Sequence, residues 1–144
     1  KGIGLFAANG FNEGDVVGEY VGDVMPAVED AERPQTPSVG ATRSDRHCYF
    51  MRLGKGDVID ASRRGGLTRF LNHSCAPNAE AQNWTVGGEM RVAIIAKCTI
   101  PRGAEVTFDY SWGSSRARRK PEDVAPDCRC LCGADDCRGE LGDR

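Results

Sequence analysis

Two stretches dominate the chemistry of this chain: Arg69-Phe70-Leu71-Asn72-His73-Ser74-Cys75-Ala76-Pro77-Asn78 and Gly103-Ala104-Glu105-Val106-Thr107-Phe108-Asp109-Tyr110. The first places an amide, an imidazole, a hydroxyl and a thiol on four consecutive residues. The second ends in the alternation Val106 to Tyr110, which is typical of a β-strand with one buried face. Taken alone, that alternation favours a core strand in which Tyr110 only packs.

Strand signals on either side of these stretches predict a mainly β fold of several small sheets. Strand signals occur at 48–51, 58–59, 90–95 and 106–110, and Gly, Pro and Asp turns separate them. The 18 glycines and 7 prolines favour turns and short strands over long helices. Residues 2–24, with a turn at 12–15, predict a β-hairpin, and residues 28–33 predict a short helix.

Length and composition are those of a single domain. With 144 residues, of which 40% are hydrophobic, the chain can bury a core of its own. Residues 26–46 hold three prolines and many charges, so we expect an exposed insert there. The net charge of -2 argues against a surface that coats nucleic acid. No run approaches the roughly 18 apolar residues of a membrane span, and we expect a soluble domain.

The cysteines gather near the end of the sequence and indicate a metal site. Four of the seven lie within 128–137, and Cys130, Cys132 and Cys137 form a C-x-C-x4-C pattern. Thiols this close suit metal ligation better than separate disulfide loops. Three ligands are one short of the tetrahedral set that Zn²⁺ takes. From spacing alone, the candidates for the fourth are Cys48, Cys75, Cys98 and Cys128.

Together, the two opening stretches resemble the signature motifs of the SET-domain lysine methyltransferases. In family order the chain also carries Gly2-Ile3-Gly4, Glu19-Tyr20-Val21-Gly22, Tyr49, Asp60-Ala61 and a cysteine tail followed by Arg138-Gly139. Through His47-Cys48-Tyr49-Phe50-Met51 and residues 82–92, it is most similar to the group of Set2, Ash1 and nuclear-receptor-binding SET proteins. The ordered series spans nearly the whole chain, which argues against a chance match.

The resemblance implies a SET-domain fold of several small β-sheets with short helices and a knot-like C-terminal core. It implies a SET domain at 1–111 with a variable insert at 26–46, a lid or linker loop at 112–127 and a zinc-binding post-SET tail at 128–144. In this family the cysteine of the Asn-His-Ser-Cys motif completes the zinc site. The implied ligands are Cys75, Cys130, Cys132 and Cys137.

The implied reaction moves a methyl group from S-adenosylmethionine to a histone lysine, which in this group is chiefly lysine 36 of histone H3. The sulfonium carries its own charge and leaving group, so the protein must mainly place a neutral amine in line with the methyl. A lysine of pKa about 10.4 is neutral in only roughly 0.04% of molecules at pH 7. A desolvating aromatic channel lowers that pKa and holds the lysine stem.

Residue roles follow from the same resemblance. Tyr110 corresponds to the catalytic tyrosine, Phe108 to the channel position that governs how many methyl groups are added, and Tyr20 to a channel wall. The cofactor-binding positions are Lys1, Gly2, Ile3, Gly4, His47, Cys48, Tyr49, Asn72 and His73.

The implied partner is a histone tail, that of H3 in nucleosomes, and the implied setting is a chromatin-associated monomer in the nucleus. Nucleosomal DNA could contact the basic run at 116–120, and loop 112–127 could cover the lysine channel until a nucleosome displaces it. One alternative is a catalytically inactive SET module that binds histone tails or chromatin. Intact Tyr110, Asn72 and His73 argue against it. A second alternative, a small zinc-stabilised nucleic-acid-binding protein, has only the basic run in its favour.

Overall fold

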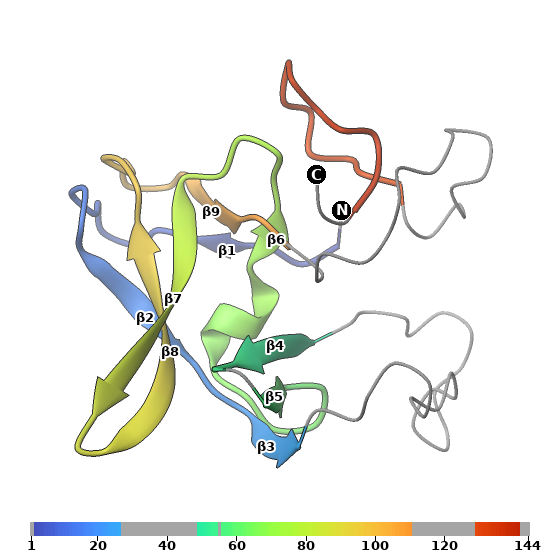
Figure 1. Ribbon diagram of the computed structural model, residues 1–144. Coiled ribbons are helices and arrows are strands. Elements are labelled where there is room, and N and C mark those ends of the chain that lie inside the picture. The colour runs from blue at the N-terminus through green and yellow to red at the C-terminus, as the bar shows by residue number, and fades with distance from the viewer. Residues whose placement is uncertain (1, 27–48, 55, 111–128, 142–144) are drawn as a thin grey trace.

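The computed structural model describes residues 2–26, 49–54, 56–110 and 129–141 (Figure 1). Within these ranges, nine strands form three small sheets, and the helical structure is a single 3₁₀ turn, η1 (Leu67–Phe70). The prediction of a mainly β fold of several small sheets is confirmed. The helix predicted at 28–33, nearly all of the insert and the loop 112–127 lie outside the described residues. No helix in the described ranges is long and apolar enough to cross a membrane.

The first sheet is antiparallel and has β8 (Glu89–Ala96) between β2 (Val16–Tyr20) and β7 (Ala79–Val86). The final five residues of β8 are buried, so this strand forms the centre of the core. Sequence analysis missed β7, which is half polar and largely exposed. Its signal was the Gly87-Gly88 pair, because both residues have positive φ, as a two-residue hairpin turn requires.

The second sheet has β5 (Asp57–Asp60) between β3 (Asp23–Pro26) and β4 (Phe50–Leu53). Gly22 enters it at a point where the chains nearly touch, since an added Cβ would lie 2.5 Å from the carbonyl oxygen of Asp60. In Figure 1 this sheet lies below η1, the green coil at the centre, and the β8 sheet lies to the left of that coil.

The third sheet joins the two signature stretches. In it, β9 (Glu105–Phe108) pairs antiparallel with β1 (Leu5–Phe6) and parallel with β6 (Asn72–His73). The parallel register sets Asn72 opposite Thr107 and His73 opposite Phe108. Residues separated by more than thirty positions in the sequence therefore lie side by side.

The β-hairpin predicted over 2–24 is wrong, although its turn is present. At the turn, the Asn12 N–H donates to the Asp15 carboxylate at 2.7 Å, and Gly14 has a φ of 84°. The flanking strands do not pair with each other, because β1 pairs with β9 and β2 with β8. A two-residue β1 offers β2 little apolar surface, whereas β8 offers a long buried run.

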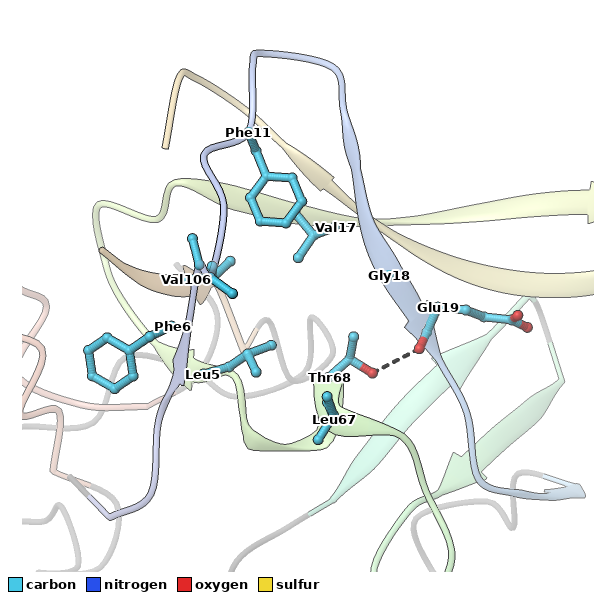
Figure 2. Close-up of a pocket in the computed structure, with 11 residues that line it drawn as sticks. Leu5, Phe6, Phe11, Val17, Gly18, Glu19, Leu67, Thr68 and Val106 are labelled. Atoms are coloured by element: carbon cyan, nitrogen blue, oxygen red, sulfur yellow. Dashed lines mark hydrogen bonds between the residues drawn. The ribbon is translucent and has the colours of Figure 1, made fainter. Parts of the chain in front are cut away.

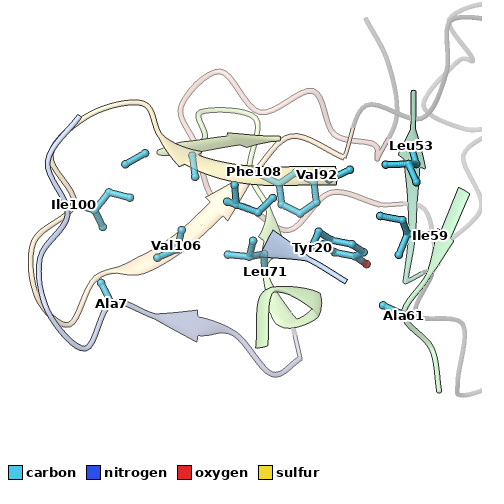
Figure 3. Packing of buried hydrophobic residues seen from close by; sticks show 13 residues of the cluster. Ala7, Tyr20, Leu53, Ile59, Ala61, Leu71, Val92, Ile100, Val106 and Phe108 are labelled. Carbon is cyan, nitrogen blue, oxygen red and sulfur yellow. The ribbon is translucent and has the colours of Figure 1, made fainter. Parts of the chain in front are cut away.

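The core runs between the sheets and reaches the ends of β2 and β9 (Figure 3). A separate groove of about 410 Å³ opens between β1, β2 and η1 (Figure 2). Apolar side chains such as Leu5, Phe11 and Val17 line it. None of the described site candidates is among its lining residues, so the groove is distinct from the site they form.

Candidate active site and metal centre

Three aromatic residues predicted to line a lysine channel come together where β2 and β9 end. Tyr20 and Phe108 are the last residues of these strands and are 4% and 7% exposed. The ring centroids of Phe108 and Tyr110 are 4.9 Å apart with a tilt of 51°. Burial, reinforced by the nearby Tyr110, raises the pKa of Tyr20 far above its usual value. The Tyr20 hydroxyl is therefore a neutral group at physiological pH.

Tyr110 is held at both its backbone and its hydroxyl by the first signature stretch. Its N–H donates to His73 Nδ1 at 3.0 Å, and its hydroxyl donates to the carbonyl oxygen of Leu71. The His73 and Tyr110 rings meet edge to face, with centroids 5.4 Å apart. These contacts fix the orientation of a partly exposed tyrosine, as a catalytic group requires.

The Gly-X-Gly turn lies against Asn72 and Glu105. The Asn72 amide donates to the carbonyl oxygen of Ile3 at 3.3 Å and to Glu105 Oε1 at 2.6 Å. An added Cβ on Gly4 would lie 2.7 Å from that carboxylate oxygen, so glycine permits the close approach. The structure thus brings together predicted cofactor residues, Ile3 and Asn72, that lie 69 positions apart in the sequence. Sequence analysis assigned Glu105 no separate role, although it lies within the second motif.

The remaining cofactor candidates have different positions. Lys1, His47 and Cys48 lie outside the described residues. Tyr49 packs against the core, and the guanidinium of Arg69 lies 4.4 Å from the centre of its ring. Tyr49 and Arg69 both contribute to the electrostatic environment of Tyr20, which places them near the aromatic cluster. Arg69 was missed as a separate site residue, although it opens the first motif.

His73 is buried and links Tyr110 to a thiol. Because Nδ1 accepts the Tyr110 N–H, the proton of the neutral ring belongs on Nε2. That atom lies 3.3 Å from the sulfur of Cys75. The histidine ring therefore connects the end of β9 to the cysteine centre.

Four cysteines form this centre: Cys75 and the three tail residues Cys130, Cys132 and Cys137. Their sulfurs all lie within 4.8 Å of one another, and none is in a disulfide. The Cys75 and Cys130 sulfurs are 3.8 Å apart. A Zn–S bond of about 2.3 Å gives a tetrahedral edge of about 3.8 Å, so the donors fit Zn²⁺. Among the fourth-ligand candidates, Cys98 is exposed outside the cluster, and Cys48 and Cys128 are not described.

Hydrogen bonds around the cysteine centre suit thiolate sulfur. The N–H of Arg138 donates to Cys75 at 3.3 Å, and that of Ala134 donates to Cys132 at 3.5 Å. Burial raises the pKa of Cys75 and of Cys130. It also acts to raise the pKa of Cys132, but backbone hydrogen bonds and neighbouring thiols outweigh it and bring that pKa to about 6. A bound cation would favour the thiolate form of all four.

An ion pair joins the tail to the residue between Phe108 and Tyr110. The Arg138 guanidinium donates to the two carboxylate oxygens of Asp109, at 2.8 and 2.6 Å. This pairing raises the pKa of Arg138, which stays charged. Sequence analysis quoted both residues within motifs and gave neither a role, because spacing does not show that they meet.

The chain is similar to known proteins over nearly its whole length. The SET domain family model matches residues 2–111. An H3 lysine-36 specific histone-lysine N-methyltransferase of Yarrowia lipolytica is 42% identical over 142 residues, which are 99% of this chain and 17% of that protein. The histone-lysine N-methyltransferase SETD2 of Homo sapiens is 39% identical over 99% of this chain and 5% of its own length. NSD3 of Mus musculus is 38% identical over 100% and 9%.

The chain therefore spans less than a fifth of the length of these relatives. The family match, in contrast, covers most of the chain and contains both signature stretches. On this match, the chain belongs to the SET-domain family.

Proposed function

We propose that this chain is the catalytic domain of a protein-lysine N-methyltransferase that uses S-adenosylmethionine and acts on lysine 36 of histone H3. One observation carries the proposal. The parallel pair β6–β9 places Asn72, which holds the Gly-X-Gly turn, beside the strand that leads to Phe108 and Tyr110. A cofactor site and an aromatic channel thereby meet. The choice of H3 lysine 36 rests on the relatives that carry this specificity in their names.

In this proposal, S-adenosylmethionine supplies an activated methyl group, and the chain's residues supply geometry. The turn at Gly2 to Gly4 presents main-chain groups to the cofactor, and Asn72 and Glu105 hold the turn in place. Tyr20, Phe108 and Tyr110 surround the lysine stem, exclude water and favour the neutral amine. The hydroxyl of Tyr20 keeps its proton, so no negative charge forms there to stabilise the ammonium form.

We also propose a structural Zn²⁺ held by the four-cysteine centre. Four thiolates complete a tetrahedral shell and leave no open position for catalysis, as in other structural zinc sites. The ion would order a tail in which Leu131 is 68% exposed. The ion would thereby hold in place Arg138, which contacts both Cys75 and Asp109.

The proposed setting is chromatin in the nucleus, with H3 in nucleosomes as partner. Arg116, Arg118, Arg119 and Lys120 lie outside the described residues, and their contact with nucleosomal DNA stays a prediction from sequence. Replacing all four with Ala should reduce methylation of nucleosomes more than that of free H3 peptide. Equal losses on both substrates would contradict a role in DNA contact.

The decisive experiment incubates the chain with methyl-labelled S-adenosylmethionine and recombinant nucleosomes, followed by mass spectrometry of the histones. Tyr110→Phe serves as the active-site variant, and Val16→Ala, an exposed change on β2, serves as the matched control. Label on H3 lysine 36 in wild type and control, with strong loss in Tyr110→Phe, is expected. Label on another lysine would overturn the substrate assignment alone. Cofactor binding without any transfer would favour the inactive SET module.

A further inference from the structure

Two routes of contact connect Tyr110 with the cysteine centre. On one route, the Tyr110 N–H donates to His73 Nδ1 at 3.0 Å, and His73 Nε2 lies 3.3 Å from the sulfur of Cys75. On the other route, the Arg138 N–H donates to that same sulfur at 3.3 Å. The guanidinium of Arg138 donates to the carboxylate of Asp109, the residue before Tyr110. These contacts connect the five residues in a closed ring around the end of β9.

We propose that Arg138 is a positioning residue, which transmits the order of the cysteine centre to Tyr110 through its paired hydrogen bonds to Asp109. The inference rests on the proposed methyl transfer, which requires Tyr110 to hold one orientation. It assigns to a tail residue a role in the geometry of the transfer step, separate from metal binding.

The geometry of the ion pair supports this role. Two parallel N–H···O bonds fix both the distance and the plane of the carboxylate, which a single contact would not do. The side chains of Arg138 and Asp109 are only 16% and 30% exposed. Screening by water is therefore weaker than for an ordinary surface ion pair, whose contribution is often negligible.

Burial of the guanidinium gives a second argument. The Nε atom of Arg138 is buried and has no hydrogen-bond partner, so the side chain carries a desolvation cost. Asp109 is the group that compensates this cost. The nearby His73 Nε2, at 3.4 Å from Arg138 Nη2, does not help, because both nitrogens are donors in the tautomer that Tyr110 imposes. The position of the Arg138 guanidinium is thus coupled to that of the Asp109 carboxylate.

Position along the chain makes the pair relevant to catalysis. Asp109 follows Phe108, the last residue of β9, and precedes Tyr110, whose hydroxyl reaches back to Leu71. If the carboxylate is released, the backbone beyond β9 loses one of its anchors. The Tyr110 N–H then separates more often from His73, and the ring samples orientations that do not fit the transfer geometry.

The test compares Arg138→Ala and Arg138→Lys with Arg129→Ala, an exposed change in the same tail and next to Cys130. Four quantities are measured: zinc per chain, the rate of hydrogen exchange of the Tyr110 amide by NMR, and kcat and KM on H3 peptide. Arg138→Ala should retain zinc, expose the Tyr110 amide to faster exchange and lower kcat about tenfold or more while KM changes little. Arg138→Lys keeps the charge but loses the paired hydrogen bonds, so its kcat and Tyr110 exchange rate should lie between those of wild type and Arg138→Ala. Arg129→Ala should match wild type throughout.

A double-variant cycle separates positioning from general damage. Asp109→Asn should lower kcat as Arg138→Ala does, and the double variant should be no worse than either single one. Loss of zinc in Arg138→Ala and Arg138→Lys would make the arginine a structural part of the metal site and overturn the inference. Unchanged Tyr110 exchange would overturn it too. Exchange and zinc content need no activity, so a wild type that transfers no methyl would sink the proposed function and leave this contact testable.

Discussion

Replacing Gly4 with alanine is the most direct test of the cofactor turn. The backbone of Gly4 does not have a positive φ, so alanine adds no backbone strain. The added Cβ instead meets Glu105 Oε1 at 2.7 Å and Asn72 Nδ2 at 3.0 Å. Ordinary contact begins at 3.4 Å, so the carboxylate must retreat by the difference of about 0.7 Å.

That retreat weakens a specific hydrogen bond. The Asn72 amide nitrogen and the Glu105 carboxylate oxygen are 2.6 Å apart, and a shift of this size stretches them by up to about 0.7 Å, to the long edge of hydrogen-bond geometry. A hydrogen bond to a charged group contributes about 1.5–3 kcal/mol. Both displaced atoms are the ends of side chains, which can find water, so the cost to the free energy of unfolding should be only about 1 kcal/mol. The main loss should fall on cofactor affinity, at about ten- to hundredfold in Kd.

Calorimetric titration with S-adenosylmethionine measures that Kd, and urea unfolding measures stability. Gly56→Ala is the matched control, because its added Cβ meets nothing within 4 Å. We expect the control to match wild type in both assays. Wild-type cofactor affinity in Gly4→Ala would refute the reasoning that Asn72 and Glu105 hold the turn for the cofactor. Unfolding of the variant by several kcal/mol would show that the turn serves the core.

Three further predictions concern the metal, the channel and pH. Cys75→Ser should lose zinc by elemental analysis while the exposed Cys98→Ser retains it; loss in Cys128→Ser with retention in Cys75→Ser would contradict the ligand set. Phe108 lacks a hydroxyl that could restrain a substituted nitrogen, so wild type should add more than one methyl and Phe108→Tyr should accumulate monomethyl-lysine; a wild type that stops at monomethyl in mass spectra would refute this. The pKa of Tyr20 is raised above its unfolded value, so the stabilising effect of its neutral hydroxyl is complete below about pH 10 and is lost as pH rises. Above about pH 10, the free energy of unfolding of wild type, measured with urea, should fall more steeply with pH than that of Tyr20→Phe, by up to about 1.4 kcal/mol per pH unit. Equal slopes for the two proteins would show that Tyr20 ionises normally.

Much of the candidate site could be predicted from sequence, because its chemistry lies in short motifs. Neighbouring positions such as Asn72 and His73 keep their spacing in any fold, and C-x-C-x4-C brings three thiols together within one turn of chain. The mainly β class followed in the same way from local alternation and turn residues. Local patterns also located the turn at 12–15 correctly.

Tertiary structure decided which distant groups meet. Local pattern predicted that the strands on either side of the 12–15 turn pair with each other, but both found partners on β8 and β9, where more apolar surface could be buried. From the residues alone, four cysteines were equal candidates for the fourth ligand, and the fold brought Cys75 to Cys130 across 55 positions. The spacing of Asp109 and Arg138 in the sequence did not predict that they form an ion pair. Sequence determines the side chains and the conformations of a few neighbouring residues. Contacts across such separations depend instead on which sheet pairings offset the entropy that is lost when the loops between the strands close.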